Sequence, residues 1–312
     1  MLPLKIYIQH PDLLGIAILK RFGGWMSNRL YLQLRFRLET GRKLDLKHPS
    51  TFEEKLQWLK LYDHRQEYTM MVDKVKVKKY VADTIGSEHV IPLLGVWNKP
   101  EDIDWNTLPD SFVLKTNHSG GNEGIVICSD KKSFDRQEAI HRLNKSLRSD
   151  DVYENFREWP YKNVPRRVFA EEYIAPPSGV KDLPDYKWFC FDGEPMYCQV
   201  IQDRTTHETI DFFDTNWIHQ EFVGLEPKAG NNSVAPSRPA NLDTHLHIAR
   251  QLSKGIPFAR IDLYETDKGV LFGEITFYPK SGFGRFTPCE WSYKLGELIH
   301  LPAFDNKTDE KK

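Results

Sequence analysis

The chain has 312 residues, with 43 Lys and Arg side chains against 44 Asp and Glu, and a formal net charge of −1. With 40% hydrophobic and 28% charged residues, its composition is that of an ordinary globular protein and excludes collagen-like, low-complexity and wholly disordered chains. The balanced charge argues against a nucleic-acid partner. The length predicts about two domains.

Cysteine spacing and apolar runs bear on the compartment. The four cysteines, at positions 128, 190, 198 and 289, form no C-x-x-C pair, which argues against a disulfide framework or a structural zinc site. The best candidate for a membrane span, Leu13 to Leu19, is far too short and is closed by Lys20 and Arg21. The start lacks the basic segment and the cleavage site of a signal peptide. We therefore expect a reduced, cytoplasmic protein.

Residues 1–47 are unusually basic, with nine Lys or Arg side chains against three Asp or Glu, and they include Trp25, Tyr31 and Phe36. One interpretation is an arm that lies on an anionic membrane surface, at the inner face of the membrane, with basic residues for attraction and aromatic residues at the interface. The other is a helical segment packed on the body with its charges in solvent, because the basic residues do not fall on one helical face.

The middle of the chain predicts helices and a glycine-rich hairpin. Overlapping capping boxes, Ser50-x-x-Glu53 and Thr51-x-x-Glu54, predict a helix over residues 51–64, and a second helix should run from about Asp73 to Gly86. Strands over residues 112–115 and 125–128 flank a glycine-rich loop, and a helix is expected over residues 133–148.

The later half predicts a sheet. Strands are expected over residues 167–174, 186–191, 196–202 and 210–213, followed by a helix over residues 243–254 that stops at Gly255. Two last strands, over residues 258–264 and 270–277, should form a hairpin around the turn Thr266–Gly269, and residues 305–312 read as a polar tail.

The last hairpin contains a candidate metal site. If its turn is centred on Lys268, Asp262 lies opposite Glu274 and Arg260 opposite Thr276, all on one face of the sheet. Two opposed carboxylates repel each other unless a cation lies between them, and Mg²⁺ is the natural candidate for oxygen ligands. The alternative is a solvent-facing pair whose charge Arg260 balances.

The glycine-rich loop is a candidate phosphate site. Lys115 ends a strand and is followed by residues 116–124, in which Ser119, Gly120 and Gly121 could turn backbone N–H groups toward an anion. The lysine precedes the glycines, so this is not a Walker A sequence. An unliganded hairpin connection is the alternative. His118 could act in acid–base chemistry or only as a hydrogen-bonding partner.

From about Phe52 to Leu298 the chain resembles the ATP-grasp enzymes, and most closely their TupA-like, teichuronopeptide-biosynthesis-type branch. The agreeing segments, in order, are residues 52–63, 91–97, 112–118, 185–188 and 272–279. The resemblance implies an α+β fold in which two α+β subdomains clasp ATP under a mobile glycine-rich lid. It implies a lid subdomain over residues 71–170 and a metal-binding subdomain over 171–304. Residues 1–70 depart from the family pattern, because they read as a basic, mostly helical region where many ATP-grasp ligases have a Rossmann-like domain.

The resemblance also implies roles for single residues. Lys74 and Lys115 are similar to the two nucleotide lysines of the first subdomain, and Lys187 to the lysine that approaches the phosphates from the second. The remaining implied nucleotide contacts are Glu171, the backbone near Glu172 and Ile174 at the adenine, and Asp182 or Asp185 at the ribose.

For the metal strands, the resemblance implies that Asp262 and Glu274 hold one or two Mg²⁺ ions while Arg260 stabilises the transferring phosphoryl group. Thr276 stands where the family usually has asparagine, which puts a second ion in doubt. Lys280, in the following loop, is similar to the contact for a carboxylate substrate.

The implied reaction is carboxylate–amine ligation through an acylphosphate, in which an amino acid or amino sugar is joined to a uronic acid of a surface polysaccharide. The partners are then a small-molecule amine and a carbohydrate carboxylate. The alternatives are an ATP-grasp kinase, a metal-dependent glycosyltransferase of the same pathway, and a nucleotide-sensing or scaffold protein whose magnesium site has decayed.

Overall fold

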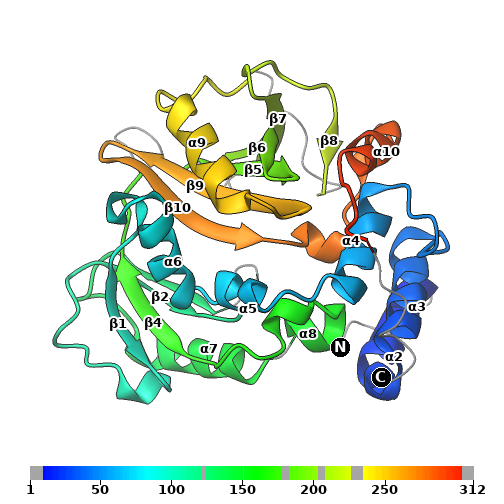
Figure 1. The fold of residues 1–312 in the computed structure, drawn as a ribbon. Coiled ribbons are helices and arrows are strands. Elements are labelled where there is room, and N and C mark those ends of the chain that lie inside the picture. The colour runs from blue at the N-terminus through cyan, green and yellow to red at the C-terminus, as the bar shows by residue number, and fades with distance from the viewer. Residues whose placement is uncertain are drawn as a thin grey trace.

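The computed structural model describes residues 10–120, 124–149, 151–176, 183–202, 208–225 and 235–303. Figure 1 shows two separate antiparallel sheets with helices packed around them and two helices at one edge of the molecule. The predicted α+β class is therefore observed. None of the described helices is long and apolar enough to cross a membrane.

The N-terminal part is helical, and the bounds of its elements are α2 Pro11–Phe22, η1 Gly23–Trp25, α3 Asn28–Thr40, α4 Phe52–Tyr62, α5 Gln66–Val72, α6 Lys76–Ile85 and η2 Ser87–His89. Helix α4 begins with a capping box, in which Thr51 Oγ1 accepts from the Glu54 backbone N–H at 3.3 Å and Glu54 Oε2 accepts from the Thr51 N–H at 3.1 Å. The overlapping Ser50–Glu53 box does not form, because the buried Glu53 instead accepts a hydrogen bond from Ser292 Oγ at 2.6 Å.

The first sheet has the strand order β1-β4-β2-β3. The elements of this part are β1 Leu93–Trp97, η3 Pro100–Asp102, β2 Phe112–Thr116, β3 Ile125–Cys128, α7 Arg136–Arg148, α8 Asp151–Phe156, η4 Trp159–Tyr161 and β4 Val168–Glu172. Its small core lies between the sheet and α7, where Phe112, Leu114, Leu143 and Ala170 are fully buried. The strand predicted over residues 167–174 is observed as the shorter β4, which pairs with both β1 and β2.

The second sheet has the order β10-β9-β5-β6-β7. The elements of this part are β5 Asp185–Phe191, β6 Glu194–Gln202, β7 Thr209–Asp214, β8 Val223–Gly224, α9 Leu242–Ser253, β9 Phe258–Thr266, β10 Gly269–Thr276, η5 Pro279–Gly282, β11 Phe286–Thr287 and α10 Glu290–Glu297. Strands β8 and β11 pair separately. Helix α9 covers the apolar face of the large sheet, so the opposite face is left to carry polar side chains (Figure 1).

The N-terminal helices and the second sheet share one hydrophobic core. Phe52 of α4 is fully buried, with its ring 4.9 Å from that of Phe258 and 5.5 Å from that of Phe286. Phe36 of α3 is also fully buried in this cluster. Helix α4 thereby brings Gln57 to the loop that follows β10, where Gln57 Nε2 donates to the Gly282 carbonyl at 2.7 Å.

The β9–β10 hairpin has the predicted pairing at the carboxylates but a different turn. Thr266 pairs with Gly269, so the turn is centred between Asp267 and Lys268 and not on Lys268. A bulge at Gly273 then shifts the register by one residue, so Asp262 faces Glu274. A Cβ atom at Gly273 would lie 3.0 Å from the Asp262 carbonyl oxygen, which explains why glycine suits the bulge.

A buried histidine under the large sheet predicts acid sensitivity. His245 is fully buried, accepts from Trp188 Nε1 at 3.2 Å, and has its pKa lowered by burial from 6.5 to about 4. The unfolded chain therefore binds more protons between these values, so stability is complete above pH 6.5 and falls as the pH drops toward 4. Between pH 7 and pH 5, wild type should lose about 2 kcal/mol more unfolding free energy than H245Q.

Urea unfolding at both pH values measures this difference. H247Q is the control, because His247 is exposed on the same helix and should leave the pH dependence unchanged. Equal pH dependence of wild type and H245Q would contradict the prediction.

Candidate active site

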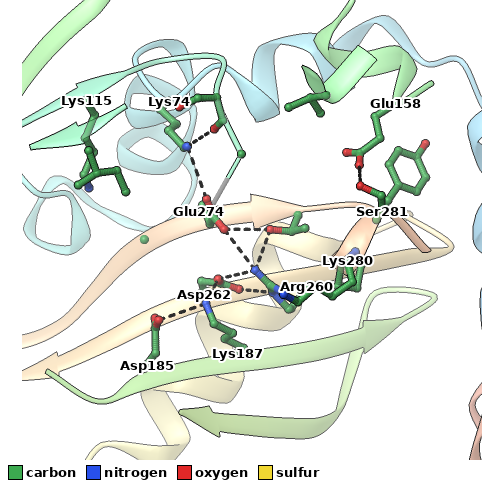
Figure 2. A pocket seen from close by; sticks show the side chains of 18 of the residues that line it. Lys74, Lys115, Glu158, Asp185, Lys187, Arg260, Asp262, Glu274, Lys280 and Ser281 are labelled. Atoms are coloured by element: carbon green, nitrogen blue, oxygen red, sulfur yellow. Dashed lines mark hydrogen bonds and ion pairs between the residues drawn. The ribbon is translucent and has the colours of Figure 1, made fainter. Parts of the chain in front are cut away.

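A pocket of about 790 Å³ lies between the two sheets. Figure 2 shows Lys74 and Lys115 on the side of the first sheet, and Lys187, Arg260 and Asp262 on the side of the second. The volume of the pocket is within the range of small-molecule sites, which is roughly 300–1,000 Å³. Basic and acidic side chains from both halves of the chain therefore face one space.

The centre of the site is the guanidinium group of Arg260, which is bonded to three side chains of the β9–β10 hairpin. Arg260 Nε and Nη2 donate to the two Asp262 oxygens at 2.7 and 2.8 Å, and Nη2 also donates to Glu274 Oε1 at 3.2 Å and Thr276 Oγ1 at 3.1 Å (Figure 2). Burial alone would lower the pKa of Arg260, but Asp262 and Glu274 raise it above its ordinary value. The opposed carboxylates are thus balanced by a permanent cation.

Lys187 holds the same carboxylate from the neighbouring strand. Its ammonium group pairs with Asp262 and lies 3.3 Å from Asp185 Oδ2, and all three side chains are buried. The pairing of β5 with β9 places Lys187 directly opposite Asp262. Asp185 and Asp262 consequently share one lysine, and Asp262 also pairs with Arg260.

Glu274 is the more accessible carboxylate, with 39% of its side chain exposed. Its Oε2 atom lies 3.9 Å from Lys74 Nζ, which reaches across from the other side of the pocket. Partial burial would raise the pKa of Glu274, but Lys74, Arg260 and Lys187 outweigh it and hold the pKa at about 2. Glu274 is therefore ionised at neutral pH and available to a cation.

The wall of the first sheet carries a second charge cluster. Glu171 of β4 pairs with Lys115 of β2, and its Oε2 atom lies 2.9 Å from Lys78 Nζ of α6. Burial alone would raise the pKa of Glu171, but the two lysines lower it, while burial lowers the pKa of Lys78. Two lysines around one carboxylate leave this wall with a positive charge.

The glycine-rich loop begins at a rigid junction. Asn117 is fully buried, and its Nδ2 atom donates to Asp73 Oδ1 at 3.0 Å and to the Pro165 carbonyl at 2.8 Å. Lys74 then donates from Nζ to the Ser119 carbonyl at 2.5 Å. The turn between α5 and α6 therefore fixes the start of the loop and aims Lys74 into the pocket.

The sequence matches the model of the TupA-like ATPgrasp family over residues 54–300. The chain belongs to the TupA-like ATPgrasp family. This match confirms the family and the fold predicted from the sequence. No curated protein matches the sequence.

Solved structures with a distant likeness include two D-alanine–D-alanine ligases. The Bacillus anthracis enzyme is 18% identical, with 68% of this chain and 58% of that chain covered and a TM-score of 0.39. The Helicobacter pylori enzyme is 14% identical, with 81% and 70% covered and a TM-score of 0.47. The ATP-grasp ligase PsnB, complexed with minimal precursor, is 13% identical, with 68% and 53% covered and a TM-score of 0.37. The TupA-like protein thus spans somewhat more than half of the first of these ligases.

Most residues singled out from the sequence of this TupA-like protein line the same pocket, namely Lys74, Lys115, His118, Ser119, Gly120, Glu171, Asp185, Lys187, Arg260, Asp262, Glu274, Thr276 and Lys280. His118 is buried, and its Nε2 atom lies 3.2 Å from the Ser149 carbonyl oxygen. Lys280 is exposed in η5 at a positive φ of 49°.

Four predicted contacts are not brought to the pocket or cannot be placed. Glu172 and Ile174 do not line it, because the Glu172 side chain points to the opposite side of β4 from Glu171 and is exposed, and its backbone N–H donates to the Pro92 carbonyl at 3.1 Å. Ile174 follows the end of the strand. Gly121 and Asp182 lie outside the described residues, as does the predicted tail over residues 305–312.

The oxygen ligands fit one magnesium ion. Mg²⁺ is usually held by one or two carboxylates together with water and substrate phosphates, and Asp262 and Glu274 provide two directly opposed carboxylates. The Thr276 hydroxyl lies 3.2 Å from Glu274 Oε1 and adds a weaker oxygen donor. Among the residues that the structure describes, no group of three or more His, Cys, Asp or Glu side chains could hold a metal ion. Further ligands of the ion would therefore be other groups, such as hydroxyl oxygens, water or substrate phosphates.

Sequence reasoning missed several residues that line the pocket. Lys78 follows Lys74 by four positions, and on the helix expected from about Asp73 this spacing would have put both lysines on one face, although α6 begins only at Lys76. Glu158 comes from an irregular segment and accepts from Ser281 Oγ at 2.6 Å (Figure 2). No periodicity marks Glu158, so only the tertiary structure reveals it.

Proposed function

We propose that this protein is an ATP-dependent carboxylate–amine ligase of surface polysaccharide biosynthesis, which joins an amino acid or amino sugar to a uronic acid. The observation that carries the proposal is membership in the TupA-like ATPgrasp family over residues 54–300. The pocket supports it, because lysines and an arginine from both sheets converge where a polyphosphate would need them.

The proposed reaction has two steps. A substrate carboxylate oxygen attacks the γ-phosphorus of ATP, and the bond between this phosphorus and the oxygen that bridges to the β-phosphate breaks. ADP departs, and the substrate carries the phosphoryl group as an acylphosphate. The amine nitrogen then attacks the acyl carbon, phosphate leaves, and the nitrogen loses a proton. Neither step needs a protein nucleophile, so the work of the protein is to position the reactants and to neutralise charge.

The described residues divide this work. Lys74 and Lys115 would hold the nucleotide phosphates from one side and Lys187 from the other, while Ser119 and Gly120 would add contacts from the loop. Arg260 would stabilise the transferring phosphoryl group. Asp262 and Glu274 would hold Mg²⁺, which would neutralise phosphate charge and polarise the phosphoryl group when bound.

The acceptor end would lie beyond Arg260. Lys280 is exposed in the loop after β10 and would bind the substrate carboxylate. His118 lies in the wall formed by the glycine-rich loop and would act in proton transfer or orient a substrate.

Product analysis tests the proposed function. The purified protein would be incubated with ATP, Mg²⁺, a set of uronic acid glycosides and an amino acid mixture, and the products identified by mass spectrometry. The expected result is an amide together with equal amounts of ADP and phosphate, formed only when both the carboxylate and the amine are present. A phosphorylated acceptor without an amide would indicate the kinase, and consumption of a sugar nucleotide would indicate the glycosyltransferase.

Loss of Lys115 should weaken ATP binding. In K115A the nucleotide would lose one charge-assisted contact worth about 1.5–3 kcal/mol, so its dissociation constant should rise about 10- to 100-fold. Glu171 keeps its ion pair with Lys78, which limits the structural damage. Calorimetric titration with Mg-ATP measures the change, and K132A, at an exposed lysine of the same subdomain, is the control. An unaltered affinity would mean that the loop after Lys115 is only a hairpin connection.

A further inference from the structure

The hairpin of α2, η1 and α3 carries an apolar surface that no described part of the chain covers. Of the twelve large apolar side chains that are exposed among the described residues, six belong to this hairpin, namely Leu14, Ile18, Phe22, Trp25, Leu30 and Leu34. Trp25 is 80% and Phe22 is 62% exposed. Clustered exposure of this kind marks an interaction surface, in contrast to single exposed residues elsewhere.

Three of the exposed side chains share one side of α2. Leu14, Ile18 and Phe22 are spaced by four residues, so they line one stripe of α2 about 12 Å long. An apolar groove of about 620 Å³ runs beside this stripe and is closed on its other side by Leu34 and Leu38 of α3. Figure 1 shows α2 and α3 at the edge of the molecule, where such a face can meet a large flat partner.

The hairpin is nevertheless fixed to the body. Tyr31 and Phe36 of α3 are buried in the main core, and Tyr31 Oη donates to the Asn155 carbonyl at 3.0 Å. Arg157 donates from Nη2 to the Gly23 carbonyl at 3.1 Å. The packed helical segment expected from the sequence is therefore present, but it buries only one side of α3 and leaves the outer side of α2 apolar and exposed.

The charges around this face are positive. Arg21, Arg29 and Arg37 are exposed on the hairpin. Its two carboxylates are Asp12 and Glu39, and Glu39 is bonded to the buried Arg35, with Nε to Oε1 at 2.9 Å. A partner that meets the apolar face thus also meets exposed cations, which favours a negatively charged surface.

From this arrangement we propose that the α2–η1–α3 hairpin binds the surface of an anionic lipid bilayer, with Phe22 and Trp25 inserted at the interface. Aromatic side chains on a helical hairpin with basic neighbours are the combination that favours shallow interfacial binding. Lys20 lines the candidate active-site pocket, and its neighbours Arg21 and Phe22 are exposed on the hairpin. Membrane contact would therefore hold this wall of the pocket close to the bilayer. The proposal does not depend on the ligase activity.

Sedimentation with lipid vesicles tests the proposal on the full-length protein. We expect wild type to sediment with vesicles of equal parts phosphatidylcholine and phosphatidylglycerol but not with phosphatidylcholine alone. The double variant F22S/W25S should bind at least about tenfold more weakly. Replacing Arg21 by Gln should cost about fivefold, and binding should weaken as salt rises.

The matched control is I127S/I218S, which removes two side chains that are 59% and 60% exposed elsewhere on the surface. It should leave vesicle binding unchanged, and thermal unfolding of all variants should match wild type because the replaced side chains are exposed. The proposal is overturned if wild type stays in the supernatant with both vesicles, or if F22S/W25S binds as well as wild type. It is also overturned if ultracentrifugation shows a dimer that F22S/W25S dissociates while vesicles are not bound, because the face would then join two copies of the chain.

Discussion

Replacing Glu274 with Gln should lower ATP-dependent phosphate release at least about 100-fold while the fold stays intact. The substitution removes one of the two opposed carboxylates without changing the size of the side chain, and charge stabilisation by a bound metal contributes several kcal/mol to a phosphoryl transfer. Because the side chain is 39% exposed and glutamine can still accept the hydrogen bond of Arg260, the fold should be kept. Phosphate release with the carboxylate and amine mixture measures the effect.

E194Q is the matched control for this prediction. Glu194 lies on the same sheet in an exposed ion pair with Arg250, outside the pocket wall, so its loss should change neither turnover nor stability by a measurable amount. If E274Q released phosphate at the wild-type rate, the assignment of Glu274 to the metal would be wrong.

The second large effect concerns stability. K187M should lower the unfolding free energy by about 3 kcal/mol, because Asp185 and Asp262 are both buried and would lose the ammonium group they share. Asp262 keeps its two bonds to Arg260, which limits the loss. Urea unfolding at neutral pH measures the change.

Magnesium makes this prediction more specific. A cation near Asp262 would replace part of the missing positive charge, so Mg²⁺ should raise the stability of K187M more than that of wild type. K268M, in the exposed turn of the β9–β10 hairpin, should match wild type in both measurements. If K187M had the same urea midpoint of unfolding as wild type, Lys187 would not stabilise the buried carboxylates.

How far the sequence predicts this molecule depends on the range of the interactions. Local signals were sufficient for α4, whose capping box is read within four residues, and for α9, which ends where Gly255 can adopt a φ of +74°. The sequence correctly predicted that Asp262 pairs with Glu274, but the turn position assumed for that prediction was wrong. The turn lies half a residue from the assumed centre, and the bulge at Gly273 restores the pairing. A bulge has no periodic signal, so strand pairing beyond the turn could not be derived by counting alone.

Tertiary contacts set the limits of the prediction. Glu53 does not cap its own helix with Ser50 but accepts a hydrogen bond from Ser292, which lies 239 residues away in the sequence. Glu171 forms ion pairs with Lys115 and Lys78, which belong to two other elements. Nothing near these residues in the sequence indicates such partners. The family resemblance placed Lys74, Lys115 and Lys187 on the pocket wall because motif order carries tertiary information that periodicity lacks.

The most direct test of the central claim is a crystal structure with Mn²⁺ and a non-hydrolysable ATP analogue, in which anomalous scattering locates the metal. The account predicts a peak in contact with carboxylate oxygens of both Asp262 and Glu274, with the triphosphate between Lys115 and Lys187. A nucleotide bound outside the pocket, or a metal peak that touches neither carboxylate, would contradict it.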